Sequence, residues 1–149
     1  MSLMKRSVFI GFLAFSCAAA TTAYASNPDV VAMHATFITK SNTKNQDPNL
    51  DIKIYDNQHV LVAENKGIPG DWGNKGINSI SLDLKKPFKE SDISGGKVEL
   101  DIHPGGKEKW DFNYNISTTY SDNSVVWQRW KGKELTQAKA ALSDTLTGD

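Results

Sequence analysis

Hydrophobic and polar residues alternate along much of the chain, and the alternation is clearest between residues 109 and 120. The even positions there begin Trp110, Phe112, Tyr114 and Ile116, whereas the odd positions are all polar. Successive side chains of a β-strand point to opposite faces, so this segment predicts a long strand with one apolar and one polar face. We expect these four side chains to lie together in the core.

The same two-residue period recurs elsewhere, strongly at residues 50–55, 79–84 and 98–103 and more weakly at 33–40, 59–64 and 125–130. Turn-forming residues separate these segments, as in Asp56-Asn57 and Ser121-Asp122-Asn123-Ser124, because Asn and Asp tolerate a positive φ and bond their own backbone. Seven to eight short strands joined by turns predict an all-β fold, an antiparallel β-sandwich. Residues 137–142 have good helical propensity, so a short and partly helical tail is expected at the end.

The first 25 residues have the organisation of a secretory signal. Lys5 and Arg6 form a basic head, residues 7–20 form an apolar run, and Ala23-Tyr24-Ala25 precedes Ser26. We therefore predict cleavage after Ala25, a β-sandwich domain at 26–136 and a tail at 137–149, in a secreted or periplasmic protein. An uncleaved anchor and a lipoprotein acylated on Cys17 are the alternatives. Bulky Phe15 and a leucine one position too far upstream disfavour acylation.

Composition narrows the function classes. Loss of Cys17 with the signal leaves a domain without disulfides. Loss of Lys5 and Arg6 leaves 15 basic residues against 17 acidic ones, a net charge of −2, which gives no basic footprint for nucleic acid. No nucleophile–base motif is present, so we predict a non-enzymatic protein and expect a monomer. A hydrolase using His103 beside Asp101 is the third-ranked alternative.

Two sets of residues could carry binding chemistry. The first is the oxygen-rich segment Asn45, Asp47, Asn49 and Asp51, whose alternating side chains could hold calcium. The alternative is an Asx-rich turn that satisfies its own backbone. Asp122 and Asn123 would approach this segment only if both loops lie at one end of the domain.

The second set is aromatic. Trp72 follows Asp71 in a glycine-containing loop, where its side chain either is exposed and contacts a ligand or packs against the domain as a structural residue. Trp127 and Trp130 flank Arg129, the only arginine after the signal. Because the two tryptophans are three residues apart, a regular strand would turn one inward and the other outward. Trp130, Arg129, Trp72, Asp71, Asp122 and Asn123 are therefore the candidate ligand-binding residues.

These residues also carry a family resemblance. Thr39, then Asp47-Pro48-Asn49-Leu50-Asp51, then Gly70-Asp71-Trp72-Gly73 is similar to the PLAT (lipoxygenase-homology) pattern, as is the stretch 93–112. Where that family has Gly-Thr-Asp, this chain has Asn49-Leu50-Asp51. The resemblance covers most of residues 35–131. It implies an eight-stranded sandwich without an active site that binds lipid, membrane or protein, sometimes with calcium.

Together these observations predict an exported, non-catalytic binding module that presents loop residues to a lipid, glycan or protein ligand, with calcium as a candidate cofactor. Peripheral contact with a membrane surface fits the same expectation. The alternative is a secreted protein-interaction factor, such as an inhibitor, adhesin or toxin-like component. It would bind through a β edge or through the Trp127-Arg129-Trp130 strand.

Overall fold

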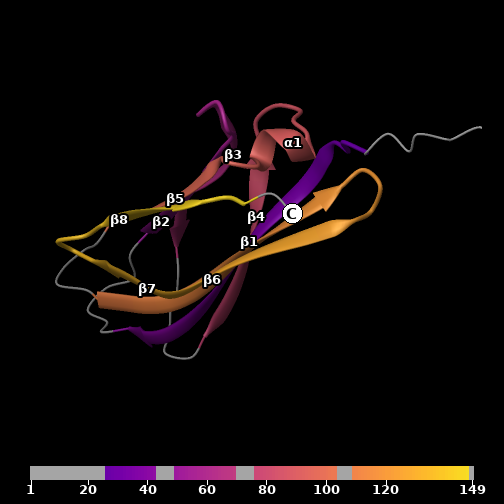
Figure 1. Cartoon of the computed structure of the whole chain (residues 1–149). Helices are drawn as coiled ribbons and strands as arrows, with labels where there is room; N and C mark the ends of the chain where they lie inside the picture. The colour runs from indigo at the N-terminus through magenta and orange to yellow at the C-terminus, as the bar shows by residue number, and fades with distance from the viewer. Residues whose placement is uncertain (1–25, 43–48, 70–75, 104–108, 148–149) are drawn as a thin grey trace, which may run out of the picture.

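The computed structural model describes residues 26–42, 49–69, 76–103 and 109–147. Eight strands and one short helix make up this part of the chain (Figure 1). They are β1 (Val30–Asn42), β2 (Asn49–Tyr55), β3 (Leu61–Pro69), β4 (Ile77–Leu84), α1 (Glu90–Ile93), β5 (Lys97–His103), β6 (Lys109–Tyr120), β7 (Val125–Thr136) and β8 (Ala141–Thr145). The predicted signal at residues 1–25 lies outside the described residues.

The strands form one antiparallel sheet in the order β7-β6-β1-β4-β3-β2-β5-β8. The sheet divides into two groups of four, because β3 and β4 pair only at Ala63↔Leu84 and Glu64↔Asp83. Its outermost strands meet again where the side chain of Gln128, on β7, bonds the backbone of Thr147, just beyond β8. The sheet is thereby nearly closed into a barrel. The predicted all-β, antiparallel class with seven to eight strands is confirmed.

The core follows the two-residue period. Trp110, Phe112, Tyr114 and Ile116 of β6 are at most 1% exposed, as predicted. Alternate residues of β2 and β5 face them, and these also are buried: Leu50, Ile52, Ile54, Val98, Leu100 and Ile102. The Trp110 and Phe112 rings stack at 3.9 Å, and the indole N–H of Trp110 donates to Thr39 Oγ1 at 3.0 Å. The other polar donor of the row, the Tyr114 hydroxyl, bonds Asp144 Oδ2 at 2.8 Å, so both buried donors are satisfied.

A bulge in β7 resets which residues face inward. Trp130 lies opposite Tyr114, but Lys133 lies opposite Phe112, so two residues of β7 face Asn113 alone. Gly132 adopts φ +63° there, a conformation that favours glycine, and its N–H donates to Asn113 Oδ1 at 2.9 Å. Beyond the bulge the inward side changes from even to odd positions, which buries Leu135.

The structure corrects the prediction for the tail. Thr136 and Lys139 close a tight turn through two backbone hydrogen bonds, and residues 141–145 then form β8 against β5. A helix there is wrong because the segment lacks an amphipathic helical face, whereas pairing satisfies the open edge of β5 and helps bury Leu146. The one-turn helix α1 was not predicted.

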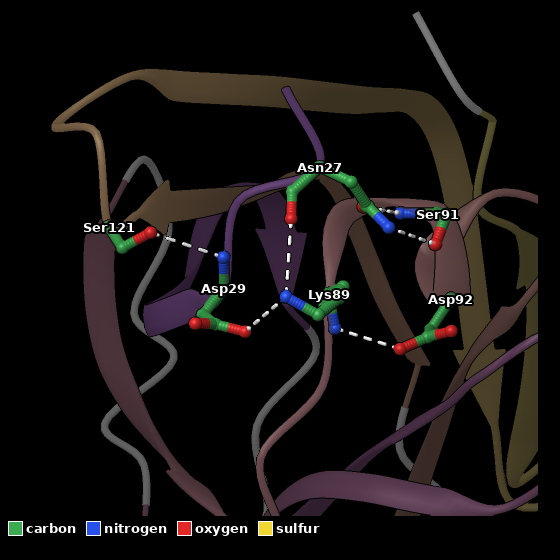
Figure 2. Close-up of polar contacts among 6 residues, drawn as sticks. All are labelled: Asn27, Asp29, Lys89, Ser91, Asp92 and Ser121. Carbon is green, nitrogen blue, oxygen red and sulfur yellow. Dashed lines mark hydrogen bonds and ion pairs between the residues drawn. The ribbon is translucent and has the colours of Figure 1, made fainter. Parts of the chain in front are cut away.

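Polar contacts hold the start of the described chain against α1 and the β6–β7 turn (Figure 2). The amide of Asn27 exchanges two hydrogen bonds with Ser91, and Lys89 Nζ lies 2.9 Å from Asp29 Oδ1. The N–H of Asp29 donates to Ser121 Oγ at 3.2 Å. These contacts begin two residues after the predicted cleavage point.

Candidate functional site

The predicted ligand residues do not form one cluster. Asn45, Asp47, Asp71 and Trp72 lie outside the described residues. Asn49 and Asp51 begin β2, at the end of the sheet where β6 also begins. Because β6 runs the length of the sheet before the Asp122-Asn123 turn, that turn lies at the opposite end. A composite site between the two acidic segments is therefore excluded for Asn49, Asp51, Asp122 and Asn123.

Asp122 and Asn123 form a hydrogen-bonded turn. Asp122 Oδ1 accepts from the backbone N–H of Ser124 at 2.9 Å and from its hydroxyl at 2.6 Å. The contact with the Ser124 side chain is the main reason that the pKa of Asp122 falls below its usual range. Asn123 adopts φ +67°, as residues of tight hairpin turns do. Both residues thus have a local structural role.

Asp51 is also engaged within the fold. Its Oδ1 accepts from the backbone N–H of Gly67 at 2.7 Å, and its Oδ2 lies 3.2 Å from His103 Nε2. Burial raises the pKa of this carboxyl, but the bonds from Gly67 and His103 outweigh that effect and hold it below its usual range. The partner of His103 is therefore Asp51 and not its strand neighbour Asp101. Among the described residues no group of three or more acidic, histidine or cysteine side chains is arranged to hold a metal, and calcium at residues 45–51 stays a prediction.

A groove of about 330 Å³ crosses the outer face of β2, β5 and β8. Its charged lining residues are Asp51, Lys53, Glu99 and Asp101. Two of these four charges are paired nearby, since Glu99 Oε1 lies 2.6 Å from Lys97 Nζ and Asp51 contacts His103. The Lys97 contact holds the pKa of Glu99 below its usual range. We call this surface the paired face.

A second groove of about 330 Å³ lies on the outer face of β1, β6 and β7. Its lining residues on that outer side are Ile38, Asn113, Asn115, Arg129 and Lys131, and Tyr114 and Trp130 complete it. Two of these residues are cations and none is acidic. In the part of the chain that the structure describes, neither Arg129 nor Lys131 has a carboxylate partner. We call this surface, together with Trp127, the basic face.

Strand alternation explains why the basic face is built this way. Trp127, Arg129 and Lys131 occupy every second position of β7 before the bulge, so their side chains recur about every 6.6 Å on the outside. Trp127 is 52% exposed. Trp130 turns inward and stacks on Tyr114 at 4.7 Å. The prediction that the two tryptophans face opposite sides is confirmed, with Trp127 as the outer one.

One amide of the basic face has an unused acceptor. Asn115 Oδ1 is buried and has no hydrogen-bond partner among the described residues, whereas Asn113 Oδ1 accepts from Gly132. A buried oxygen without a donor costs free energy that a ligand hydroxyl or N–H would recover. Sequence reasoning identified Arg129 but missed Lys131, Asn113 and Asn115. Asn113 and Asn115 are recognisable in the sequence as polar positions of the 109–120 strand. The sequence does not specify which strands lie beside that one.

The fold and this surface define an all-β antiparallel domain with a basic, amide-lined outer groove. Comparison with known proteins found no matching family model, no matching curated protein and no matching solved structure. The described residues contain no helix with the length and hydropathy of a membrane span.

Proposed function

We propose that the protein is an exported, non-catalytic binding module whose ligand surface is the basic face. The observation that carries this proposal is the pair of cations Arg129 and Lys131, which border one groove without an acidic residue in its lining. Unpaired cations contribute little to folding, and they are well suited to hold an anionic ligand. The proposed ligand surface is therefore a sheet face, whereas the sequence predicted the end loops.

Export is part of the same proposal. The signal at residues 1–25 would leave Ser26 as the first residue, and the contacts of Asn27 and Asp29 in Figure 2 follow directly. This supports a mature domain that begins near residue 26. Cleavage would remove Cys17, the only cysteine, and a mature chain without cysteine can fold in an oxidising compartment without a disulfide step.

The finer architecture belongs here as well. We infer that the two four-strand groups pack as the layers of a PLAT-like sandwich. The single two-pair connection between β3 and β4 supports two layers, and eight strands is the number that the resemblance implies. The calcium part of that resemblance rests on Asn45, Asp47, Asn49 and Asp51. Calorimetric titration of the mature protein with calcium tests this part, with the Asp51→Ala variant as the control. The absence of binding heat at millimolar calcium would contradict calcium binding.

Binding through a β edge, the alternative function, has less support. The two outermost strands face each other, and Gln128 of β7 bonds both backbone groups of Thr147 at 2.8 Å. An incoming strand would have to separate them before it could pair with either edge. The outer residues of the Trp127-Arg129-Trp130 segment are part of the basic face.

The test is a binding measurement on the mature protein, residues 26–149. Polygalacturonate, poly-glutamate and phosphatidylglycerol vesicles serve as anionic probes in calorimetry at low and high salt. We expect binding to at least one probe that weakens tenfold or more in Arg129→Ala/Lys131→Ala. The matched control is Lys53→Ala/Lys97→Ala, which removes the same charge from the paired face. Equal losses in both variants would overturn the proposal, because the effect would then follow net charge and not the groove.

A further inference from the structure

The outer face of β7-β6-β1 is an ordered array of side chains with three rows across the strands. Trp127 lies beside Ser117 and His34 in the first row, and Arg129 lies beside Asn115 and Thr36 in the second. The third row pairs Asn113 with Ile38, and Lys131 borders the same groove. The first row thus has an exposed aromatic ring, the second a cation beside an amide and a hydroxyl, and the third a second cation beside an amide and an aliphatic residue.

This array has the dimensions of a chain ligand and not of a compact headgroup. Trp127 and Lys131 are four residues apart on one strand, a separation of about 13 Å. The groove beside Arg129 and Lys131 is bordered by outward-pointing side chains of three strands, and Trp127 lies next to it along β7. A ligand that meets all three rows at once must extend along β7.

The chemistry of the rows specifies what such a chain should carry. An exposed indole offers a flat apolar surface with little conformational entropy to lose, which suits the apolar face of a pyranose ring. The guanidinium of Arg129 forms two parallel hydrogen bonds with a carboxylate, and Lys131 supplies a second positive charge. The unpartnered Oδ1 of Asn115 requires a donor, which a sugar hydroxyl provides.

We propose that the basic face binds an acidic polysaccharide, a chain of pyranose rings bearing carboxylate groups; this inference rests on the proposed function. Trp127 stacks on one ring, Arg129 holds a carboxylate, Lys131 attracts the next acidic group, and Asn115 Oδ1 accepts a hydrogen bond from a hydroxyl. Each of these groups alone is common on protein surfaces. Their placement on one outer sheet face, with Trp127 two positions before Arg129 on β7, gives the face its selectivity for a ligand that is at once charged, hydroxylated and ring-shaped.

The experiment compares probes that separate these properties. Polygalacturonate has sugar rings and charge, fully methyl-esterified polygalacturonate has the rings without the charge, and poly-glutamate has the charge without the rings. Phosphatidylglycerol vesicles present the charge on lipid. We expect the wild-type mature domain to bind polygalacturonate at least tenfold more tightly than each of the other three.

Two substitutions on β7 then assign the roles. Trp127→Ala should weaken polygalacturonate binding about tenfold and leave any residual poly-glutamate binding unchanged, because only the sugar ring stacks. Val125→Ala is the matched control, since Val125 is an exposed residue on the same side of the same strand. Its affinity should equal that of the wild type. Binding of polygalacturonate should also change the tryptophan fluorescence of the wild type more than that of Trp127→Ala, in which Trp130 still lines the groove.

The outcomes separate this inference from the proposed function. If poly-glutamate or vesicles bind as tightly as polygalacturonate and still depend on Arg129 and Lys131, the polysaccharide inference is overturned and the binding module stands. If none of the four probes binds, or if Arg129→Ala/Lys131→Ala binds as the wild type does, both are overturned. Selective polygalacturonate binding that requires Trp127 supports both.

Discussion

The paired face and the basic face have grooves of the same volume, about 330 Å³, yet they use charge in opposite ways. On the paired face, Lys97 forms an ion pair with Glu99. Asp51 contacts His103 and accepts a hydrogen bond from the Gly67 N–H. On the basic face Arg129 and Lys131 have no acidic neighbour in the groove. A charge that is satisfied within the fold supports the fold, whereas a charge left without a partner is available to a ligand.

Two carboxyl groups of the paired face have lowered pKa values. Hydrogen bonding to Lys97 lowers the pKa of Glu99, and hydrogen bonds outweigh burial to lower the pKa of Asp51. Such shifts mean that the ionised carboxylates contribute to the stability of the folded state. The stability of the β2-β3-β5 region should therefore respond to changes in its charges, and the basic face should respond in binding alone.

Asp56, at the β2–β3 turn, provides the largest expected effect. It is 4% exposed, its Oδ1 accepts from the N–H groups of Gln58 and Val60, and its Oδ2 lies 3.2 Å from Lys86 Nζ. Asp56→Ala leaves these donors without their acceptor, so we expect a loss of about 2–3 kcal/mol in the free energy of unfolding, measured by urea denaturation. Asp122→Ala is the control, because that carboxylate closes an exposed turn of the same kind in the other half. An equal loss of unfolding free energy in Asp56→Ala and Asp122→Ala would show that the burial of Asp56 does not make its turn more important for stability than the exposed turn of Asp122.

The second effect concerns the side-chain link between β6, β7 and β8. The carboxylate of Asp144 accepts from the Tyr114 hydroxyl at 2.8 Å and is paired with Lys133. Burial and this contact together raise the pKa of Tyr114, so the phenol stays a donor. Asp144→Ala should cost about 2 kcal/mol and Tyr114→Phe about 1 kcal/mol, because the latter keeps the ring stacked on Trp130. Equal unfolding midpoints for the two variants would contradict a shared acceptor.

The sequence predicted the strands better than it predicted their neighbours. Residues 109–120 predicted β6 and its inward row because the two-residue period is a local property of the chain. The tail at 141–145 has no such signal, and it forms β8 because β5 offers an open edge. The change of face at Gly132 was also hidden, since it depends on a hydrogen bond to Asn113 on another strand.

The same distinction applies to the candidate site. Alternation along residues 125–130 indicated that one tryptophan would be exposed, and Trp127 is. The groove itself requires β1, β6 and β7 to be neighbours, and the residues that pair β1 with β6 lie far apart in the sequence, as in Val30 with Tyr120. Local patterns contain no information about that pairing, so Asn115 and Lys131 could not be joined to Arg129 from the sequence. The sequence instead predicted a ligand surface on the loops, because Asp, Asn and Trp residues are conspicuous in the predicted loop segments.

Acid sensitivity offers a third, smaller effect. Burial raises the pKa of Asp56, but the bonds from Val60, Lys86 and Gln58 outweigh it and hold the pKa below its usual range. A carboxyl with a lowered folded pKa stabilises the protein fully above its unfolded pKa of about 3.9. That contribution is lost as the pH falls through the lower folded value. Thermal melts of the wild type should therefore lose stability below about pH 4. Asp56→Asn should show a flatter profile, and a profile parallel to that of the wild type would contradict this origin.

The smallest expected effect is on the stability of the basic face, and it tests the comparison most directly. Arg129 and Lys131 have no acidic partner in their groove, so removing both charges should change the free energy of unfolding by no more than about 0.5 kcal/mol. Urea denaturation of Arg129→Ala/Lys131→Ala measures this, with Lys86→Ala as the control that removes one charge from a paired position. A loss larger than that of Lys86→Ala would mean that the two cations stabilise the fold through contacts within the chain. If the stability is unchanged while affinity falls, the two cations serve the ligand and not the fold, which is the division that separates this face from the other.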